Sequence, residues 1–231
     1  MKVNNRNKFI HMFRADSDSK FKGPHQNQPK ATGGADVNDA KGAMILIHGR
    51  GASAPSILTL TDEFNAPELH YVAPQASGHQ WYPNSFLAPT DRNEPGLSSG
   101  LQVIFDIITD LESSGIPKEK IILLGFSQGA CLASEYVARH PAKYGGLAAL
   151  SGGVIGDSVS ADNYSGSLEQ TPVFLGCSNI DPHIPKERVD ETEQILSGLG
   201  ADVTKNIYKG MGHTINEDEI NKVIDLIRAV I

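Results

Sequence analysis

Two hydrophobic patterns alternate along most of the chain. Short runs typical of strands occupy residues 43–49, 69–74, 121–124, 147–152, 172–178 and 202–208. The run at 121–124 is apolar throughout, as in a strand buried on both faces. Between them, helical spacing of apolar residues or helix-forming composition predicts helices over residues 53–64, 98–113, 130–138, 186–199 and 217–230. Because strands and helices take turns, we expect an α/β fold with a mostly parallel central sheet and helices on both faces. We assign residues 43–231 to a single domain.

Two segments lack either pattern. Residues 1–42 are polar with scattered Gly and Pro, and we expect an irregular lead-in with at most short strands, in which His25 is a solvated loop histidine. Residues 75–95 are rich in Pro, Asn and Gly and contain Trp81 and Tyr82. Such a long loop is usually functional. It is either a wall or flap over a small pocket, with Trp81 and Tyr82 lining it, or a surface loop that Trp81 anchors in the core.

A serine stands at one junction between a predicted strand and a predicted helix. The strand at 121–124 leads into Gly125-x-Ser127-x-Gly129, and the helix follows at once. Strand, G-x-S-x-G and helix in this order are typical of a nucleophile elbow. Glycines are needed where a sharp turn leaves no room for a Cβ atom. The N–H groups that open the helix then point towards an oxyanion formed at Ser127.

A serine nucleophile needs a histidine base, and the histidine needs a carboxylate that fixes its tautomer. His213 follows the last predicted strand, and Asp181 follows the strand before it. Since parallel strands end at one edge of a sheet, we expect Ser127, Asp181 and His213 to meet there. Asp157 and Asp162, in the preceding loop, are alternative carboxylates. His183 is expected at the pocket rim.

An oxyanion needs two converging N–H donors. One is expected from the backbone of Gln128, directly after the serine, and the other from Arg50 in the turn His48-Gly49-Arg50-Gly51. The Arg50 guanidinium either favours esters with a nearby anionic group or points to solvent.

The composition of the chain limits which classes of binding partner are expected. The 231 residues hold 27 acidic and 20 basic side chains, so a nucleic-acid surface is not expected. The longest apolar runs are too short for a membrane span. Cys131 and Cys177 have no metal-ligand spacing and are expected as buried free thiols in a reducing compartment. The N-terminus lacks the apolar stretch of a signal peptide, and we therefore expect a cytoplasmic location. We expect no metal or cofactor.

With these motifs in view, the chain resembles the phospholipase/carboxylesterase family of α/β-hydrolases, which includes bacterial carboxylesterases and acyl-protein thioesterases. The resemblance runs from about residue 43 to the C-terminus. The residues that carry it are Gly125-Phe126-Ser127-Gln128-Gly129-Ala130, His48-Gly49-Arg50-Gly51, Trp81-Tyr82, Asp181-Pro182-His183-Ile184-Pro185 and Gly210-Met211-Gly212-His213.

The resemblance implies an α/β-hydrolase fold and hydrolysis of a small-molecule carboxylic ester through an acyl-enzyme on Ser127. The thioesterases usually carry leucine where this chain has Arg50, and their segment matching residues 75–95 is shorter. Both departures favour short acyl chains. Long-chain acyl thioesterase or lysophospholipase activity is the alternative, and a non-catalytic binding protein on the same scaffold is a third. Some family members dimerise, and a homodimer stays open.

Overall fold

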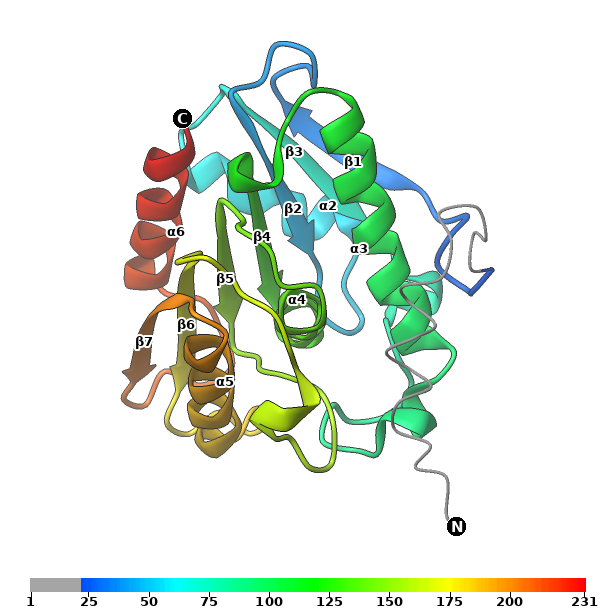
Figure 1. The fold of residues 1–231 in the computed structure, drawn as a ribbon, viewed down its shortest axis with the longest axis vertical. Coiled ribbons are helices and arrows are strands. Elements are labelled where there is room, and N and C mark those ends of the chain that lie inside the picture. Colours follow the sequence, from blue (N-terminus) through cyan, green and yellow to red (C-terminus); the bar gives the residue numbers. More distant parts are fainter. Residues whose placement is uncertain (1–21) are drawn as a thin grey trace.

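The computed structural model describes residues 22–231, which form a seven-stranded sheet (Figure 1). The strand order is β1-β3-β2-β4-β5-β6-β7, and every neighbouring pair is parallel except β1 and β3. The strands are β1 (Lys30–Gly34), β2 (Gly42–Ile47), β3 (Leu69–Pro74), β4 (Ile121–Phe126), β5 (Gly146–Leu150), β6 (Pro172–Ser178) and β7 (Asp202–Tyr208). The mostly parallel sheet predicted from the sequence is confirmed.

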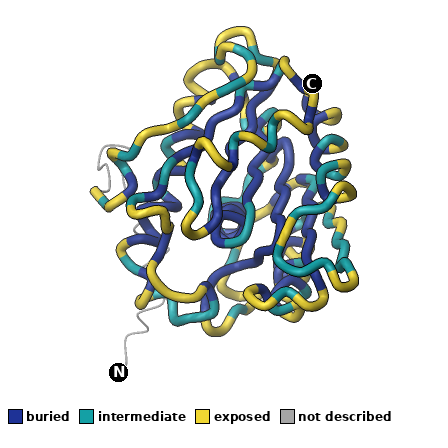
Figure 2. Tube along the Cα trace, turned by 180° about the vertical axis from the view of Figure 1, so that it is seen from behind, coloured by how far each residue is buried: buried dark blue, intermediate teal, exposed yellow. Residues whose placement is uncertain are grey.

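Helices cover both faces of the sheet, as predicted. One face packs against α3 (Gly96–Ser113), α4 (Gln128–Arg139) and α5 (Lys186–Gly198), and the other against α2 (Ala54–Leu58) and α6 (Glu217–Val230). Alternate side chains of the central strands enter the two cores, so that Ile45 joins the α4 side and Met44 the α6 side. The central strands and α4 are almost entirely buried (Figure 2). Within residues 22–231, no helix is long and apolar enough to cross a bilayer.

The lead-in before residue 43 contains a short strand, which the sequence leaves open: residues 30–34 form β1 at the antiparallel edge of the sheet. Residues 1–21 lie outside the described part of the chain. One helix prediction was wrong in part. The helix predicted over residues 53–64 is α2 followed by a 3₁₀ turn, Thr59–Glu63. Ser53 is the N-cap of α2, and its side chain accepts a hydrogen bond from the Ser56 N–H.

The prediction of a solvated His25 was also wrong. His25 is 3% exposed, and its backbone N–H donates to Ser99 Oγ in α3. The Ser77 N–H donates to His25 Nδ1, so the proton is on Nε2, which lies 2.9 Å from the Trp81 carbonyl oxygen. Burial lowers the pKa of His25. A neutral histidine thus ties the loop that follows β3 to α3.

The segment from 75 to 95 is anchored in the core, which decides between the two alternatives left by the sequence. It contains the 3₁₀ turns Ser77–His79 and Thr90–Asn93. Trp81 is fully buried, and the aromatic side chains that follow it in this segment are 2% (Tyr82) and 5% (Phe86) exposed. Because its large side chains fill the interior, this segment is part of the packed domain.

The first turn of α4 touches the end of β2 without any side chain between them. A Cβ atom added to Gly129 would lie 2.0 Å from the Ile47 carbonyl oxygen and 2.7 Å from that of His48. At Gly125 an added Cβ atom would lie 2.3 Å from the Gly129 carbonyl oxygen. Glycine is required at both positions for close approach, as the G-x-S-x-G pattern predicts.

We expect Gly129→Ala to lower the free energy of unfolding by about 2–3 kcal/mol or more, because β2 and α4 must separate to admit the methyl group. Urea unfolding followed by circular dichroism measures this change. Gly198→Ala, at the end of α5, is the matched control, because an added Cβ atom there has no neighbour within 4 Å. The control should stay within about 1 kcal/mol of wild type. Equal stability of the two variants would contradict the close contact.

Candidate active site

Ser127 stands on a strained turn between β4 and α4. Its backbone has φ 56° and ψ −121°, and its N–H donates to the Leu150 carbonyl oxygen at the end of β5. A non-glycine residue with positive φ persists only where the surrounding structure holds it. The glycine contacts described above and this hydrogen bond provide that support. The turn leaves Ser127 partly exposed, at the carboxyl edge of the sheet.

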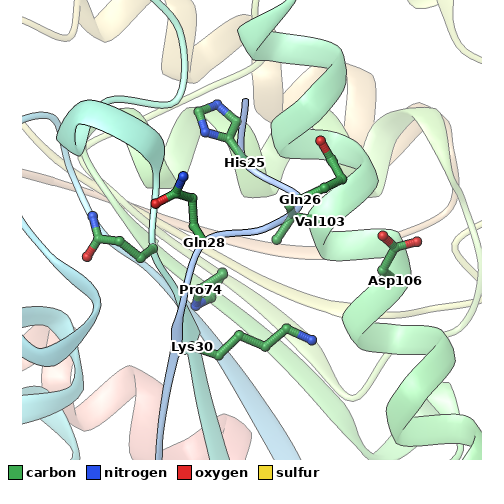
Figure 3. A pocket seen from close by; sticks show the side chains of 8 residues that line it. His25, Gln26, Gln28, Lys30, Pro74, Val103 and Asp106 are labelled. Carbon is green, nitrogen blue, oxygen red and sulfur yellow. The ribbon is translucent and has the colours of Figure 1, made fainter. Parts of the chain in front are cut away.

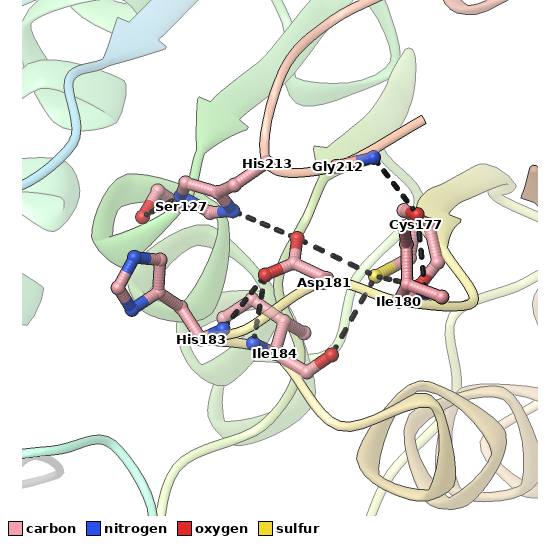
Figure 4. A network of polar contacts seen from close by, with 9 residues as sticks. Ser127, Cys177, Ile180, Asp181, His183, Ile184, Gly212 and His213 are labelled. Carbon is pink, nitrogen blue, oxygen red and sulfur yellow. Dashed lines mark hydrogen bonds and ion pairs between the residues drawn. The ribbon is translucent and has the colours of Figure 1, made fainter. Parts of the chain in front are cut away.

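Three loops bring Ser127, His213 and Asp181 together (Figure 4). His213 Nε2 lies 2.9 Å from Ser127 Oγ, and His213 Nδ1 lies 2.7 Å from Asp181 Oδ2. Because an ionised carboxylate only accepts hydrogen bonds, Nδ1 carries the proton, and Nε2 is free to accept the Ser127 hydroxyl. The three side chains follow β4, β6 and β7, the strand ends where the sequence places them. Asp157 and Asp162 are both exposed, and Asp181 is the carboxylate that contacts His213.

The Asp181 carboxylate is fully buried. Burial by itself raises its pKa, but a hydrogen bond from His213 and backbone N–H donors from His183 and Ile184 favour the charged form, and the pKa is lowered overall. The two N–H groups bind Oδ1 at 2.9 and 3.1 Å (Figure 4). The Cys177 thiol lies 4.0 Å from Oδ2. Asp181 therefore stays ionised beside His213 through neutral pH.

Two aromatic rings hold the His213 imidazole. The Phe126 ring centroid lies 5.0 Å away, and the His183 ring meets His213 edge-on at 4.9 Å. His183 is exposed and packs beside the partly exposed His213. Its expected role at the pocket rim stays a prediction.

The turn after β2 lies directly beside the serine. A Cβ atom added to Gly49 would be 3.3 Å from both the Ser127 Cβ atom and the Phe126 carbonyl oxygen. In this turn the Gly51 N–H donates to the His79 carbonyl oxygen, and the Ala52 N–H donates to that of Gly49. Gln128 is the first residue of α4, where helix geometry leaves the N–H without a partner inside the helix. The Arg50 and Gln128 backbones thus flank Ser127.

The Gln128 side chain has a structural role that sequence reasoning missed. Its Oε1 accepts the Trp81 N–H at 2.8 Å, and its Nε2 donates to the Tyr82 carbonyl oxygen at 2.9 Å. Gln128 is 6% exposed. The buried amide therefore satisfies one backbone N–H and one backbone carbonyl group of residues 81 and 82.

The Arg50 side chain is exposed, and its guanidinium binds the segment that follows β3. Nη1 donates to Gln80 Oε1 and the Pro83 carbonyl oxygen, and Nη2 donates to the carbonyl oxygens of Tyr82 and Asn84. The four terminal N–H bonds of a guanidinium are thereby used. These donors are therefore engaged within the protein although the side chain lies at the surface, and a preference for anionic esters stays a prediction.

Trp81 and Tyr82 are core residues in the structure, and their expected place in the substrate pocket stays a prediction. Both are buried, and Trp81 Nε1 donates to the His48 carbonyl oxygen at 2.9 Å. His48 Nε2 in turn accepts the Ala76 N–H, so Nδ1 carries the proton and donates to the Gly49 carbonyl oxygen. These contacts fix the turn that follows β2 and lies beside Ser127.

A separate small cavity lies between α3 and the start of β1 (Figure 3). Its volume is about 50 Å³, room for one or two water molecules, and it shares no residue with the serine site. Its lining is His25, Gln26, Gln28, Lys30, Pro74, Gln75, Val103 and Asp106. Across residues 22–231, no three His, Cys, Asp or Glu side chains gather as metal ligands would.

Comparison with known proteins agrees with this geometry. The family model described as Phospholipase/Carboxylesterase matches residues 35–231. The chain belongs to this family. The family is one of serine hydrolases with the α/β-hydrolase fold, and its match includes Ser127, Asp181 and His213.

Relatives of this family member are named either carboxylesterases or acyl-protein thioesterases. The chain is 42% identical to a phospholipase/carboxylesterase from Dyadobacter fermentans, with a TM-score of 0.85 and coverage of 90% of this chain and 99% of that one. It is 29% identical to acyl-protein thioesterase 1 of Candida albicans, over 85% of this chain and 95% of that protein. A probable carboxylesterase of Oryza sativa is 26% identical over 77% of this chain and 73% of its own length.

In this family member, a buried acid supports the turn that carries His213. Asn216 and Glu219 cap α6 reciprocally, each side chain accepting the other residue's N–H at 2.9 Å. Asn216 Nδ2 also contacts Met211 Sδ in the same turn. Glu219 packs so closely on β6 that a Cβ atom added to Gly176 would meet its Oε1 at 2.2 Å. Burial raises the pKa of Glu219 to about 7.

A raised carboxyl pKa makes the folded protein hold a proton that the unfolded chain releases. The contribution is present below about pH 4.5 and is lost as pH rises through about 7. We expect Glu219→Gln, which keeps an acceptor for the Asn216 N–H, to flatten the fall in unfolding free energy between pH 5 and 8 by up to about 3 kcal/mol. Urea unfolding at a series of pH values measures it. Glu217→Gln, at an exposed position in the same helical turn, controls for the loss of one charge. Parallel plots of unfolding free energy against pH for wild type and Glu219→Gln would contradict the raised pKa of Glu219.

Proposed function

We propose that this protein hydrolyses carboxylic esters through an acyl-enzyme on Ser127. The observation that carries the proposal is the pair of hydrogen bonds in series from Ser127 through His213 to Asp181. In this arrangement His213 Nε2 takes the Ser127 proton while Oγ attacks the ester carbonyl carbon. Asp181 holds the tautomer and stabilises the imidazolium that forms.

The carbonyl oxygen then becomes an oxyanion between the backbone N–H groups of Gln128 and Arg50. One such donor contributes roughly 3–4 kcal/mol in comparable enzymes. Collapse of the tetrahedral intermediate expels the alcohol, which receives the proton from His213. Water, deprotonated by His213, then attacks the acyl-enzyme, and Ser127 is regenerated when its proton returns.

We propose short acyl chains as the substrate class. Supporting this, the guanidinium of Arg50 and the carbonyl groups that it binds make the surface beside the turn polar, where the related thioesterases usually have leucine. A second candidate is long-chain thioester or lysophospholipid hydrolysis. It is favoured by the name of the acyl-protein thioesterase 1 from Candida albicans.

Replacing the nucleophile tests the reaction. Ser127→Ala should lower turnover of p-nitrophenyl acetate by roughly 10⁴-fold or more, since the remaining residues cannot form the acyl-enzyme. It should also abolish labelling by a fluorophosphonate probe, with an unchanged circular dichroism spectrum. Ser114→Ala, exposed at the end of α3, serves as the control and should keep full activity. Turnover retained by Ser127→Ala would refute the proposed nucleophile.

A series of p-nitrophenyl acetate, butyrate, octanoate and palmitate tests the acyl chain length. We expect kcat/KM to be highest with acetate or butyrate, because the polar surface beside the oxyanion turn gives a long alkyl chain little apolar area to bury. Ser127→Ala supplies the background rate for each ester. An optimum at palmitate would favour the long-chain candidate instead.

A further inference from the structure

The Tyr82 carbonyl oxygen joins the two residues proposed to form the oxyanion hole. It accepts one hydrogen bond from Arg50 Nη2 at 2.8 Å and another from Gln128 Nε2 at 2.9 Å. A carbonyl oxygen has two lone pairs, so both donors are accommodated. Gln128 follows Ser127 directly, and Arg50 follows Gly49, which packs against Ser127, while both side chains bind the same distant peptide group.

The two side chains hold this peptide with different strengths. Gln128 is buried and binds both the Trp81 N–H and the Tyr82 carbonyl group. Its loss would leave the Trp81 N–H unpaired in the interior and Arg50 as the remaining donor to the Tyr82 carbonyl oxygen. Arg50 is exposed, which weakens each of its hydrogen bonds, but its planar guanidinium fixes four oxygens of residues 80–84 at once.

The same short segment also contacts the rest of the turn that follows β2. Trp81 Nε1 donates to the His48 carbonyl oxygen, and the His79 carbonyl oxygen accepts the Gly51 N–H. Residues 79–84 are therefore bonded to the turn both before and after Arg50. A displacement of this segment would move the Arg50 N–H relative to the Gln128 N–H.

We propose that the side chains of Arg50 and Gln128 are positioning residues, which set the distance between the two oxyanion donors by sharing the Tyr82 carbonyl oxygen. The proposal depends on the function proposed above. Oxyanion stabilisation is sensitive to such spacing, since a shift of about 1 Å can cost on the order of 100-fold in rate. The charge of Arg50 then acts on geometry rather than on the choice of substrate.

Replacement of each side chain by methionine keeps its approximate length and removes its hydrogen bonds. Gln128→Met should lower kcat/KM for p-nitrophenyl acetate by roughly 100-fold, and Arg50→Met, at the exposed site, by roughly 10-fold. The apparent affinity for an alkyl trifluoromethyl ketone, whose serine adduct carries the oxyanion, should fall by the same factors. KM should stay within about twofold, because the oxyanion forms only after the ester has bound.

Because both side chains act through one oxygen, their effects should not multiply. The double variant should lose clearly less than the product of the single losses. Arg50→Lys, which keeps one cationic donor, should recover part of the activity lost in Arg50→Met. Arg92→Met, exposed within the 75–95 segment, and Gln102→Met on α3 are matched controls and should keep wild-type kinetics.

The fluorescence of Trp81 reports on the packing of residues 79–84, because Trp81 is the only tryptophan in the chain. Its fluorescence should become more accessible to acrylamide in Gln128→Met and Arg50→Met and stay unchanged in both controls. This measurement, with labelling of Ser127 by a fluorophosphonate probe, separates a displaced segment from an unfolded protein. If Arg50→Met fails to fold, Arg50→Lys with Gln128→Met gives the same comparison.

Three outcomes would overturn the proposal. They are unchanged ketone affinity in both single variants, fully multiplicative losses in the double variant, or losses confined to KM. Each of these leaves the proposed function intact as long as Ser127→Ala is inactive. Turnover retained by Ser127→Ala would instead refute the proposed function, so the two failures are distinguishable.

Discussion

The candidate site depends on one contact, in which the first turn of α4 packs directly on the carbonyl end of β2. The contact exists only because residue 129 has no side chain, since an added Cβ atom would lie 2.0 Å from the Ile47 carbonyl oxygen. It places the start of α4, with the free N–H groups of a helix N-terminus, against the turn that contains Arg50. It also forces the chain through the positive φ of Ser127. The position of the serine on its strained turn therefore follows from this one packing constraint.

The sequence predicts those parts of the site whose signals are local. Ser127 lies in a strand–glycine–helix pattern, and Asp181 and His213 each follow a strand, so parallel topology brings them to one edge. The side-chain contacts of His25, Arg50 and Gln128 are not predictable in this way. Their partners are mostly backbone oxygens and N–H groups 30 to 56 positions away, and a backbone group has no signature in the sequence. The position of the five-residue strand β1 within the lead-in was not predictable, because its residues are mostly polar or glycine and only an edge strand tolerates them.

Three histidines in the structure show how hydrogen bonds determine the chemistry of identical side chains. His25 and His48 each accept a backbone N–H on one ring nitrogen and face a carbonyl oxygen with the other. Burial lowers the pKa of both, so they are neutral structural links. His213 has the carboxylate of Asp181 on one side and the Ser127 hydroxyl on the other. A carboxylate stabilises an imidazolium whereas a carbonyl group does so far less, and His213 is therefore the one of these three suited to accept a proton.

The contacts of Arg50 also bear on substrate choice. A guanidinium whose terminal N–H groups bind four neutral oxygens keeps its positive charge but has lost the paired donors that recognise a carboxylate. Its remaining influence on an anionic ester is Coulombic. At an exposed position that influence is screened beyond about 8 Å at physiological ionic strength. Any discrimination between neutral and anionic esters then depends on groups that can touch the substrate.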